Sequence, residues 1–302
     1  MTASGSYERT DIAFDADGQT VRGWLFRPQR VSGPTPLVVL GGGFSCVKEM
    51  GLPAFAERFA AAGLAALVFD YRNLGASDGS PRQELDPWQQ VEDLRHALTF
   101  ASTLPGIDPQ RLGIWGTSYS GGHCLVVGAT DRRVKCVVAQ MPTISGHWSG
   151  LRRVPMERID ELTATFAADR VRRMQGAAPI MRPIAGRPDE QPIYATPEVR
   201  AFFEREARAA PDWRNEVTLR SMEYARAYEP GAWIEFISPT PLLMIVGRQD
   251  TLTCHDLQLA AFERALEPKR LVLLRGGHFA CYDEEFEPAV AAALEWFRGH
   301  LH

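Results

Sequence analysis

The sequence lacks the long apolar runs and the one-sided charge that mark membrane proteins and nucleic-acid-binding proteins. No stretch of the 302 residues reaches the roughly 18 uninterrupted apolar residues that a membrane-spanning helix requires. Met1 to Arg9 is polar and has no apolar centre, so we expect no secretory signal peptide. The formal net charge of −4 at pH 7 favours neither nucleic acid nor an anionic membrane surface as a partner.

Cysteine is scarce and dispersed, which disfavours both a disulfide framework and a zinc site. No CxxC pair occurs, and the five cysteines are Cys46, Cys124, Cys136, Cys254 and Cys281. Such isolated residues are typical of free buried thiols in a reducing compartment, so we expect a cytoplasmic protein. Metal-ligand spacing is also missing among the histidines, and there is no HExxH. We therefore expect neither a bound metal ion nor an organic cofactor.

What the chain does contain is an ordinary globular composition, with 45% hydrophobic and 23% charged residues. Its length allows a sizeable core, either as one large domain or as one domain that carries an insertion. Residues 7–14 and 20–26 are strand-like, and the turn at 15–18 joins them into a hairpin. Strands and helices then alternate, which predicts an α/β fold: a mostly parallel central sheet with helices on both faces.

The predicted elements of this core follow from the apolar patterning. The expected strands after the hairpin are residues 36–40, 64–69, 111–115, 134–138, 241–246 and 270–274. The expected helices are 53–62, 87–104, the segment that follows Ser118, 255–266 and 288–301.

The alternation stops between Thr143 and Phe236, where no convincing strand is present. Helix-like runs occur instead at 154–166, 197–210 and 216–228. The segment holds fourteen arginines, fourteen acidic residues and no lysine, so its charge is balanced. We predict that residues 143–236 form a helical cap inserted between two core strands, and that residues 1–142 and 237–302 form the core.

A candidate nucleophile lies in the pentapeptide Gly116-Thr117-Ser118-Tyr119-Ser120. The pentapeptide follows the apolar run 111–115 and precedes two glycines, Gly121 and Gly122. A strand, a sharp turn that holds a serine, and small residues that open a helix form the layout of a nucleophile elbow. The segment resembles the GxSxG motif of the α/β-hydrolases, with Ser120 in place of the last glycine. A glycine- and serine-rich turn without function is the alternative explanation.

Two further residues complete a candidate triad, in the chain order that α/β-hydrolases use. Asp250 follows the apolar run 241–247, and His278 follows the run 270–274, so both are placed at carboxyl ends of strands. His278 would take the proton of Ser118, and Asp250 would fix the histidine tautomer. Alternatively, Asp250 caps a turn or helix and His278 is an ordinary loop residue.

An acyl-transfer site also requires backbone N–H donors for the oxyanion. One donor is expected from Tyr119, which follows the nucleophile. The other comes from the loop that starts at Gly41, which resembles the HGF-x-G-x-KE segment of family members and so implies the N–H of Phe44. The glycines of this loop could also suggest a phosphate site, but neither GxGxxG nor Gly-Lys-Ser/Thr is present. The loop Asp70–Gly79 similarly resembles the family's FDYRGFGxSDG segment, and we expect it to be structural.

The core most resembles the dienelactone hydrolases, the fungal polyketide transferases and the catalytic domain of Xaa-Pro dipeptidyl peptidases. The resemblance implies a serine hydrolase that cleaves a small-to-medium carboxylic ester through an acyl-serine. The same residues leave open a thioesterase or polyketide-type acyltransferase, and cleavage of an amide, a peptide or a carbon–carbon bond. A ligand-binding relative without catalytic activity is the alternative from another class. The expected partner is a small ester or thioester. The oligomeric state stays open, with a homodimer as one option.

Overall fold

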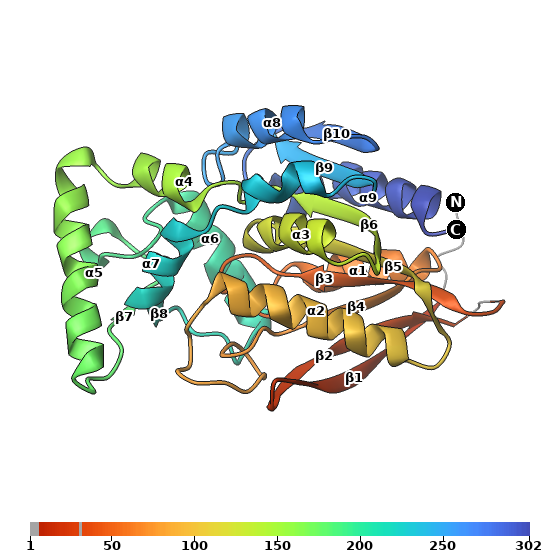
Figure 1. Cartoon of the computed structure of the whole chain (residues 1–302), viewed down its shortest axis with the longest axis horizontal. Helices are drawn as coiled ribbons and strands as arrows, with labels where there is room; N and C mark the ends of the chain where they lie inside the picture. The colour runs from red at the N-terminus through yellow and green to blue at the C-terminus, as the bar shows by residue number, and fades with distance from the viewer. Residues whose placement is uncertain (1–5, 30–31) are drawn as a thin grey trace.

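The structure, a computed structural model, describes residues 6–29 and 32–302 (Figure 1). Within this part of the chain an eight-stranded sheet has the strand order β1-β2-β4-β3-β5-β6-β9-β10. Strand β2 pairs antiparallel with both of its neighbours, and all other pairs in the sheet are parallel. The mostly parallel sheet expected from the sequence is therefore confirmed.

The elements of the core lie close to their predicted positions. The strands of this sheet are β1 (Tyr7–Ala16), β2 (Gln19–Pro28), β3 (Thr35–Gly41), β4 (Ala65–Phe69), β5 (Ile107–Thr117), β6 (Val134–Gln140), β9 (Leu242–Gly247) and β10 (Lys269–Leu274). The helices around it are α1 (Leu52–Ala61), α2 (Pro87–Thr103), α3 (Tyr119–Thr130), α8 (His255–Arg264) and α9 (Phe286–His300). The turn between β1 and β2 is tighter than expected, because Asp17 and Gly18 alone form it, with φ of 52° and 81°.

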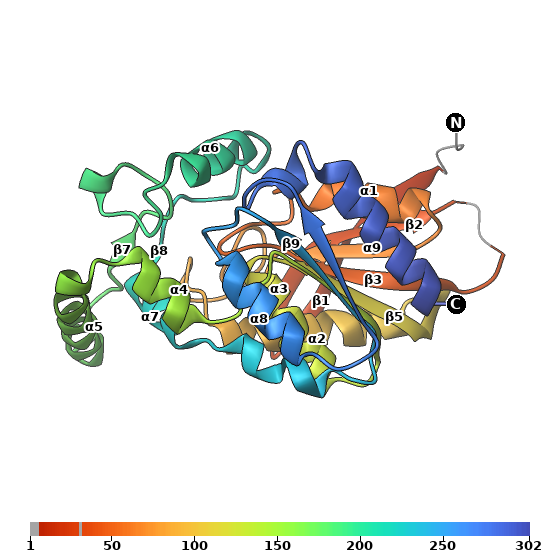
Figure 2. The same ribbon diagram turned by 90° about the horizontal axis from the view of Figure 1, so that it is seen from above.

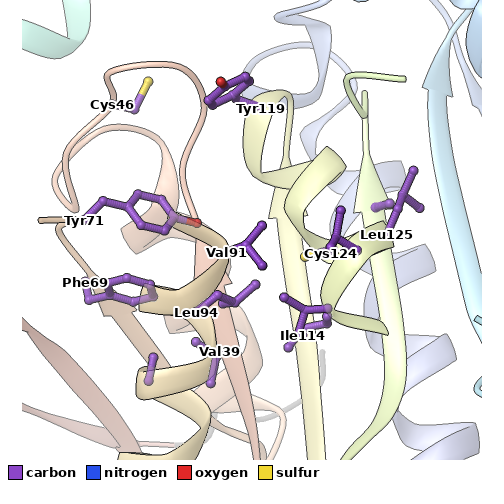
Figure 3. Packing of buried hydrophobic residues seen from close by; sticks show 14 of the residues in the cluster. Val39, Cys46, Phe69, Tyr71, Val91, Leu94, Ile114, Tyr119, Cys124 and Leu125 are labelled. Carbon is purple, nitrogen blue, oxygen red and sulfur yellow. The ribbon is translucent and has the colours of Figure 1, made fainter. Parts of the chain in front are cut away.

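The sheet is buried on both faces, as the continuous apolar strands predict. Val39 packs on one face with α2, α3 and α8, whereas the neighbouring Val38 packs on the other face with α1 and α9 (Figure 2). Figure 3 shows the first of these two cores below the nucleophile turn, where Val91 and Leu94 of α2 meet Ile114 of β5. The turn is thus built on a packed, rigid base.

Residues 143–236, here called the cap, lie between β6 and β9 and form one side of the molecule (Figure 1). The cap contains α4 (Gly146–Arg153), α5 (Ile159–Met174), α6 (Pro197–Glu206) and α7 (Leu219–Ala227), together with short 3-10 turns. Its other elements are β7 (Met181–Arg182) and β8 (Val217–Thr218), which pair with each other.

Three features of the cap differ from the sequence prediction. The first is helix α5, which covers Ile159–Met174, whereas the sequence predicted a helix over 154–166. The pair β7–β8 was not expected, because strands of two residues are too short to show an alternating pattern. Helix α4 was also not expected, since two glycines lower its helix propensity. Ser145 nevertheless caps this helix by accepting a hydrogen bond from the Trp148 N–H at 3.0 Å.

The cysteines and the helices bear on two predictions made from the sequence. All five cysteines are buried and free, as predicted. No helix in the described part of the chain combines the length and the apolar character needed to cross a membrane.

Candidate active site

Ser118 lies at the junction of β5 and α3 in a backbone conformation that few non-glycine residues adopt. Its φ is 56° and its ψ is −113°. The Ser118 N–H donates to the carbonyl of Gln140 at 2.8 Å, which anchors the turn to β6. The small neighbours are required by close packing, because a Cβ at Gly121 would lie 2.8 Å from the Pro142 Cα. The local sequence thus holds the serine hydroxyl at the carboxyl end of the sheet.

The structure brings Ser118, Asp250 and His278 together, although the first and the last are 160 positions apart in the sequence. His278 Nε2 is 3.0 Å from Ser118 Oγ, and its Nδ1 is 2.8 Å from Asp250 Oδ2. Asp250 is fully buried and His278 is 3% exposed. An imidazole between a hydroxyl and a buried carboxylate can accept the hydroxyl proton while the carboxylate fixes its tautomer.

The two oxygens of the Asp250 carboxylate have separate partners. Oδ1 accepts hydrogen bonds from the backbone N–H groups of Leu252 and Thr253, which is the turn-capping role that was the alternative explanation. Oδ2 accepts from Thr253 Oγ1 at 2.7 Å and from Gln258 Nε2 at 3.1 Å, in addition to His278. The capping role and the histidine contact therefore coexist.

These contacts keep Asp250 ionised. Burial alone would raise the pKa of the carboxyl, but the charge and hydrogen bond of His278 and the hydrogen bonds of Thr253 hold this pKa well below its usual range. Gln258 was not predicted as part of the site. It lies in the first turn of α8, eight residues beyond Asp250 in the sequence, and its only sequence signal is that spacing.

The two expected oxyanion donors lie beside the nucleophile. Tyr119 opens α3, where the first N–H groups of a helix have no intrahelical partner. Among residues 6–29 and 32–302, neither the Tyr119 nor the Phe44 backbone N–H donates a hydrogen bond. The loop before Phe44 passes close to the serine, since a Cβ at Gly43 would lie 3.4 Å from Ser118 Cβ. Their role as an oxyanion hole remains a prediction.

Two neighbouring hollows lie near the candidate triad, and Ser118 borders the smaller of them. The smaller, of about 30 Å³, is bordered by Ser118 and Tyr119 together with residues of α4 and of the Thr253 turn. The larger, of about 630 Å³, lies within the cap. Five residues border both hollows: Phe44, Arg153, Tyr194, Ala225 and Leu252. The shared residues place the two hollows next to each other, between the cap and Ser118.

The cap is attached to the loops that carry the candidate site. Phe202 of α6 stacks on Phe279, the residue after His278, with ring centroids 4.3 Å apart and an interplanar angle of 19°. Trp213 donates its indole N–H to the carbonyl of Ser45, next to Phe44, at 3.1 Å. These two aromatic residues therefore join the cap to the core.

His123 does not form a second candidate site, and no metal-binding cluster is found among the described residues. His123 is buried between the Tyr228 hydroxyl and the Gln90 side chain. Burial lowers its pKa to about 3, so it is neutral. Within the described ranges, no three His, Cys, Asp or Glu side chains gather in a way that could hold a metal ion.

Comparison with known proteins gives one family and a group of similar enzymes. The sequence model of the X-Pro dipeptidyl-peptidase (S15) family matches residues 17–280. A thiohydrolase of Eupenicillium brefeldianum is 34% identical over 277 residues, which are 89% of this chain and 87% of the fungal protein. A polyketide transferase of a Penicillium species is 31% identical over 305 residues, covering 100% of this chain and 99% of that protein.

The solved structures contain folds of the same kind. An α/β-hydrolase from Penicillium sp. sh18 superposes with a TM-score of 0.85 at 28% sequence identity, covering 97% of this chain and 99% of the other. The eight-stranded sheet described above therefore has the α/β-hydrolase fold. The same relatives support the thioesterase or acyltransferase alternative better than the carboxylic esterase that the sequence analysis put first.

Proposed function

The chain belongs to the X-Pro dipeptidyl-peptidase (S15) family of α/β-hydrolases, and we propose that it cleaves a thioester through an acyl-Ser118 intermediate. The hydrogen-bonded series Ser118–His278–Asp250, with distances of 3.0 and 2.8 Å, is the observation that carries this proposal. The names of the fungal relatives favour a thioester over an oxygen ester. Ester, thioester and amide cleavage share the same first step, so only kinetics separates them.

In the first half of the reaction, Ser118 Oγ attacks the thioester carbonyl carbon while His278 Nε2 accepts the hydroxyl proton. The negative charge on the carbonyl oxygen is stabilised by the N–H groups of Phe44 and Tyr119. The tetrahedral intermediate then collapses with cleavage of the C–S bond. The leaving sulfur takes the proton from His278 and departs as a thiol.

In the second half, a hydroxyl acceptor gives its proton to His278 and attacks the acyl carbon. The C–Oγ bond breaks, and Ser118 recovers the proton, so the site returns to its starting state. Water as the acceptor gives hydrolysis, and an alcohol gives acyl transfer. The cavity of about 630 Å³ in the cap has room for an acyl chain of moderate size.

The test compares three substrates that share one acyl group: the N-acetylcysteamine thioester, the matching oxygen ester and the matching amide. We expect the thioester to have the highest kcat/KM and Ser118→Ala to abolish its turnover while the melting temperature stays nearly unchanged. Ser102→Ala is the matched control, because this serine lies on the surface at the end of α2 and borders neither hollow. It should keep full activity.

Intact-protein mass after exposure to a fluorophosphonate provides the second readout. A single adduct on the wild type and on Ser102→Ala, absent from Ser118→Ala, would establish an activated serine. Faster cleavage of the oxygen ester would return the assignment to a carboxylic esterase. No adduct and no turnover would favour the non-catalytic binding protein. Added alcohols that divert the acyl group from water would identify a transferase.

A further inference from the structure

The large cavity in the cap is strongly cationic for a site that is expected to hold an acyl chain. Five arginines and two glutamates border it: Arg152, Arg153, Arg158, Arg182, Arg226, Glu161 and Glu198. Isolated arginines on a surface are usually solvated, so the charge alone has no functional meaning. Only guanidinium groups that have no side-chain partner in the protein are free to bind a ligand.

Three of the five arginines are paired with other side chains. Arg152 forms a bidentate ion pair with Asp256, with N–O distances of 2.6 and 2.8 Å. Arg158 pairs with Glu161 at 3.3 Å, and Arg182 donates to the side chain of Gln191 at 3.2 Å. The remaining two are Arg153 and Arg226, and in the described part of the chain neither donates to another side chain or has a carboxylate within 4.0 Å. Arg182 has no carboxylate partner either, but the Gln191 side chain holds it.

The two unpaired arginines lie side by side on α4 and α7. Arg226, in the last turn of α7, packs against Gly150, where a Cβ would come within 2.6 Å of its Nη1. Arg153, the last residue of α4, is held by a hydrogen bond from its Nη1 to the Leu252 carbonyl at 3.1 Å. Its guanidinium carbon also lies 5.3 Å from the Tyr194 ring centroid. Partial burial lowers the pKa of Arg226, and the charge of Arg153 lowers it further.

A second, independent feature lies in the small hollow that adjoins Ser118. Ser149 and Tyr119 border this hollow, and these residues are only 2% and 4% exposed. Each carries a hydroxyl group. Neither oxygen has a hydrogen-bond partner among the described residues. Ser149 and Arg153 are four residues apart on α4 and therefore share one helix face. Since buried polar groups normally find partners, these oxygens are suited to a polar group of a ligand.

We propose that Arg153, Arg226 and Ser149 form an anion subsite beside the nucleophile, which binds a carboxylate carried by the substrate. This proposal rests on the proposed function, because it assumes that the bond cleaved lies at Ser118. Arg153 and Ser118 border one hollow of about 30 Å³, which holds roughly one water-sized group. The carboxylate therefore lies only a few bonds from the scissile carbonyl. A guanidinium fork matches a carboxylate in geometry and charge.

The experiment compares thioesters that differ only in one carboxylate. In the acyl arm, N-acetylcysteamine thioesters of glutaric and adipic acids are compared with those of pentanoic and hexanoic acids. In the leaving-group arm, the butanoyl thioester of 3-mercaptopropionic acid is compared with that of its neutral amide, 3-mercaptopropionamide. Thiol release gives kcat/KM for each compound after subtraction of spontaneous hydrolysis. We expect a preference of at least about tenfold for the anionic member in one arm, which identifies the half of the substrate that carries the charge.

Variants then assign that preference to the subsite. Arg153→Gln and Arg226→Gln should each reduce it to about threefold or less. The preference is the ratio of kcat/KM for the anionic and the neutral thioester on the same variant, so a general loss of activity cancels. Arg153→Lys, which keeps the charge, should retain part of the preference. Arg152→Gln is the matched control, because Arg152 borders the same cavity but is already paired with Asp256, and it should leave the ratio unchanged.

Each outcome separates this proposal from the proposed function. Turnover of neutral thioesters with no preference in either arm would overturn the anion subsite and leave the catalytic assignment intact. A preference that survives in both Gln variants would also overturn it. If the wild type does not hydrolyse the neutral thioesters and forms no fluorophosphonate adduct, the proposed function is refuted instead.

Discussion

The hydroxyl of Ser120 donates a hydrogen bond to the backbone carbonyl of Gly42, so the nucleophile turn is tied directly to the loop before Phe44. Ser120 stands where the GxSxG motif has its last glycine, and it is fully buried. The Tyr71 hydroxyl lies 2.7 Å from Ser120 Oγ. Because the Ser120 proton is used on Gly42, Tyr71 is the donor in this pair. The departure from the motif therefore provides a link between the two halves of the proposed oxyanion hole.

Ser120→Ala should consequently lower kcat by roughly tenfold with little change in KM, because the Phe44 N–H would be less firmly placed. It should also lower the free energy of unfolding by about 1–3 kcal/mol, since the Gly42 carbonyl and the Tyr71 hydroxyl lose their partner. Tyr71→Phe is the control, because it keeps the Ser120–Gly42 bond and should reduce kcat less. Steady-state kinetics and urea unfolding provide both readouts. An unchanged kcat in Ser120→Ala would show that this link does not position the loop.

Asp250→Asn should reduce kcat/KM by about 10⁴-fold, because an amide that donates its N–H to His278 Nδ1 selects the wrong tautomer. The turn itself should persist, since the remaining oxygen can still accept from Leu252 and Thr253. The measurement is kcat/KM on the best thioester, with circular dichroism to verify the fold. A loss below tenfold would mean that another residue supplies the acid.

The core was predictable from the sequence because its signals are local. Continuous apolar runs predict the parallel strands, and each candidate residue of the triad follows such a run. Because the carboxyl ends of parallel strands lie at the same edge of the sheet, the three residues come together there. The hairpin turn at Asp17 and Gly18 was predictable for the same reason, since its chemistry lies within the turn.

The cap was less predictable because its structure depends on contacts between distant segments. Trp213 binds the carbonyl of Ser45, 168 residues away, and no local pattern encodes that pairing. Gln258 contacts Asp250 only because the turn after β9 brings the start of α8 back over the carboxylate. Helix α4 is stabilised by Ser145 and by packing against α7 in spite of its two glycines.

The buried Asp250 should also make stability depend on pH in a defined direction. Its pKa in the folded protein is lower than in the unfolded chain, so its contribution is fully present above the unfolded pKa of about 3.9. As the pH falls below that value, the unfolded chain binds a proton while the folded protein does not, and the contribution is lost.

Urea unfolding of the wild type and of Asp250→Asn, at intervals from pH 7 to pH 3, isolates this contribution. The wild type should be the more stable protein at pH 7, and the difference should be constant down to about pH 4.5. It should then narrow at lower pH. A difference that widens on acidification would mean that the folded carboxyl has a raised pKa.

The stack of Phe202 on Phe279 predicts that the cap helps to place His278, the proposed general base. Phe202 is 4% exposed, so Phe202→Ala should cost about 3–5 kcal/mol of stability through the cavity that it leaves. Because Phe279 follows His278, the same change should lower kcat per folded molecule. Phe236→Ala is the matched control, since Phe236 is 61% exposed and belongs to the same cap.

Activity of Phe202→Ala is best measured at a temperature where circular dichroism shows the variant fully folded, so that a loss of rate reflects the site and not unfolding. Titration with a fluorophosphonate then counts the competent sites. We expect a full titre with slower labelling, because the serine is present but His278 activates it less well. An unchanged labelling rate together with lower stability would limit the stack to holding the cap in place.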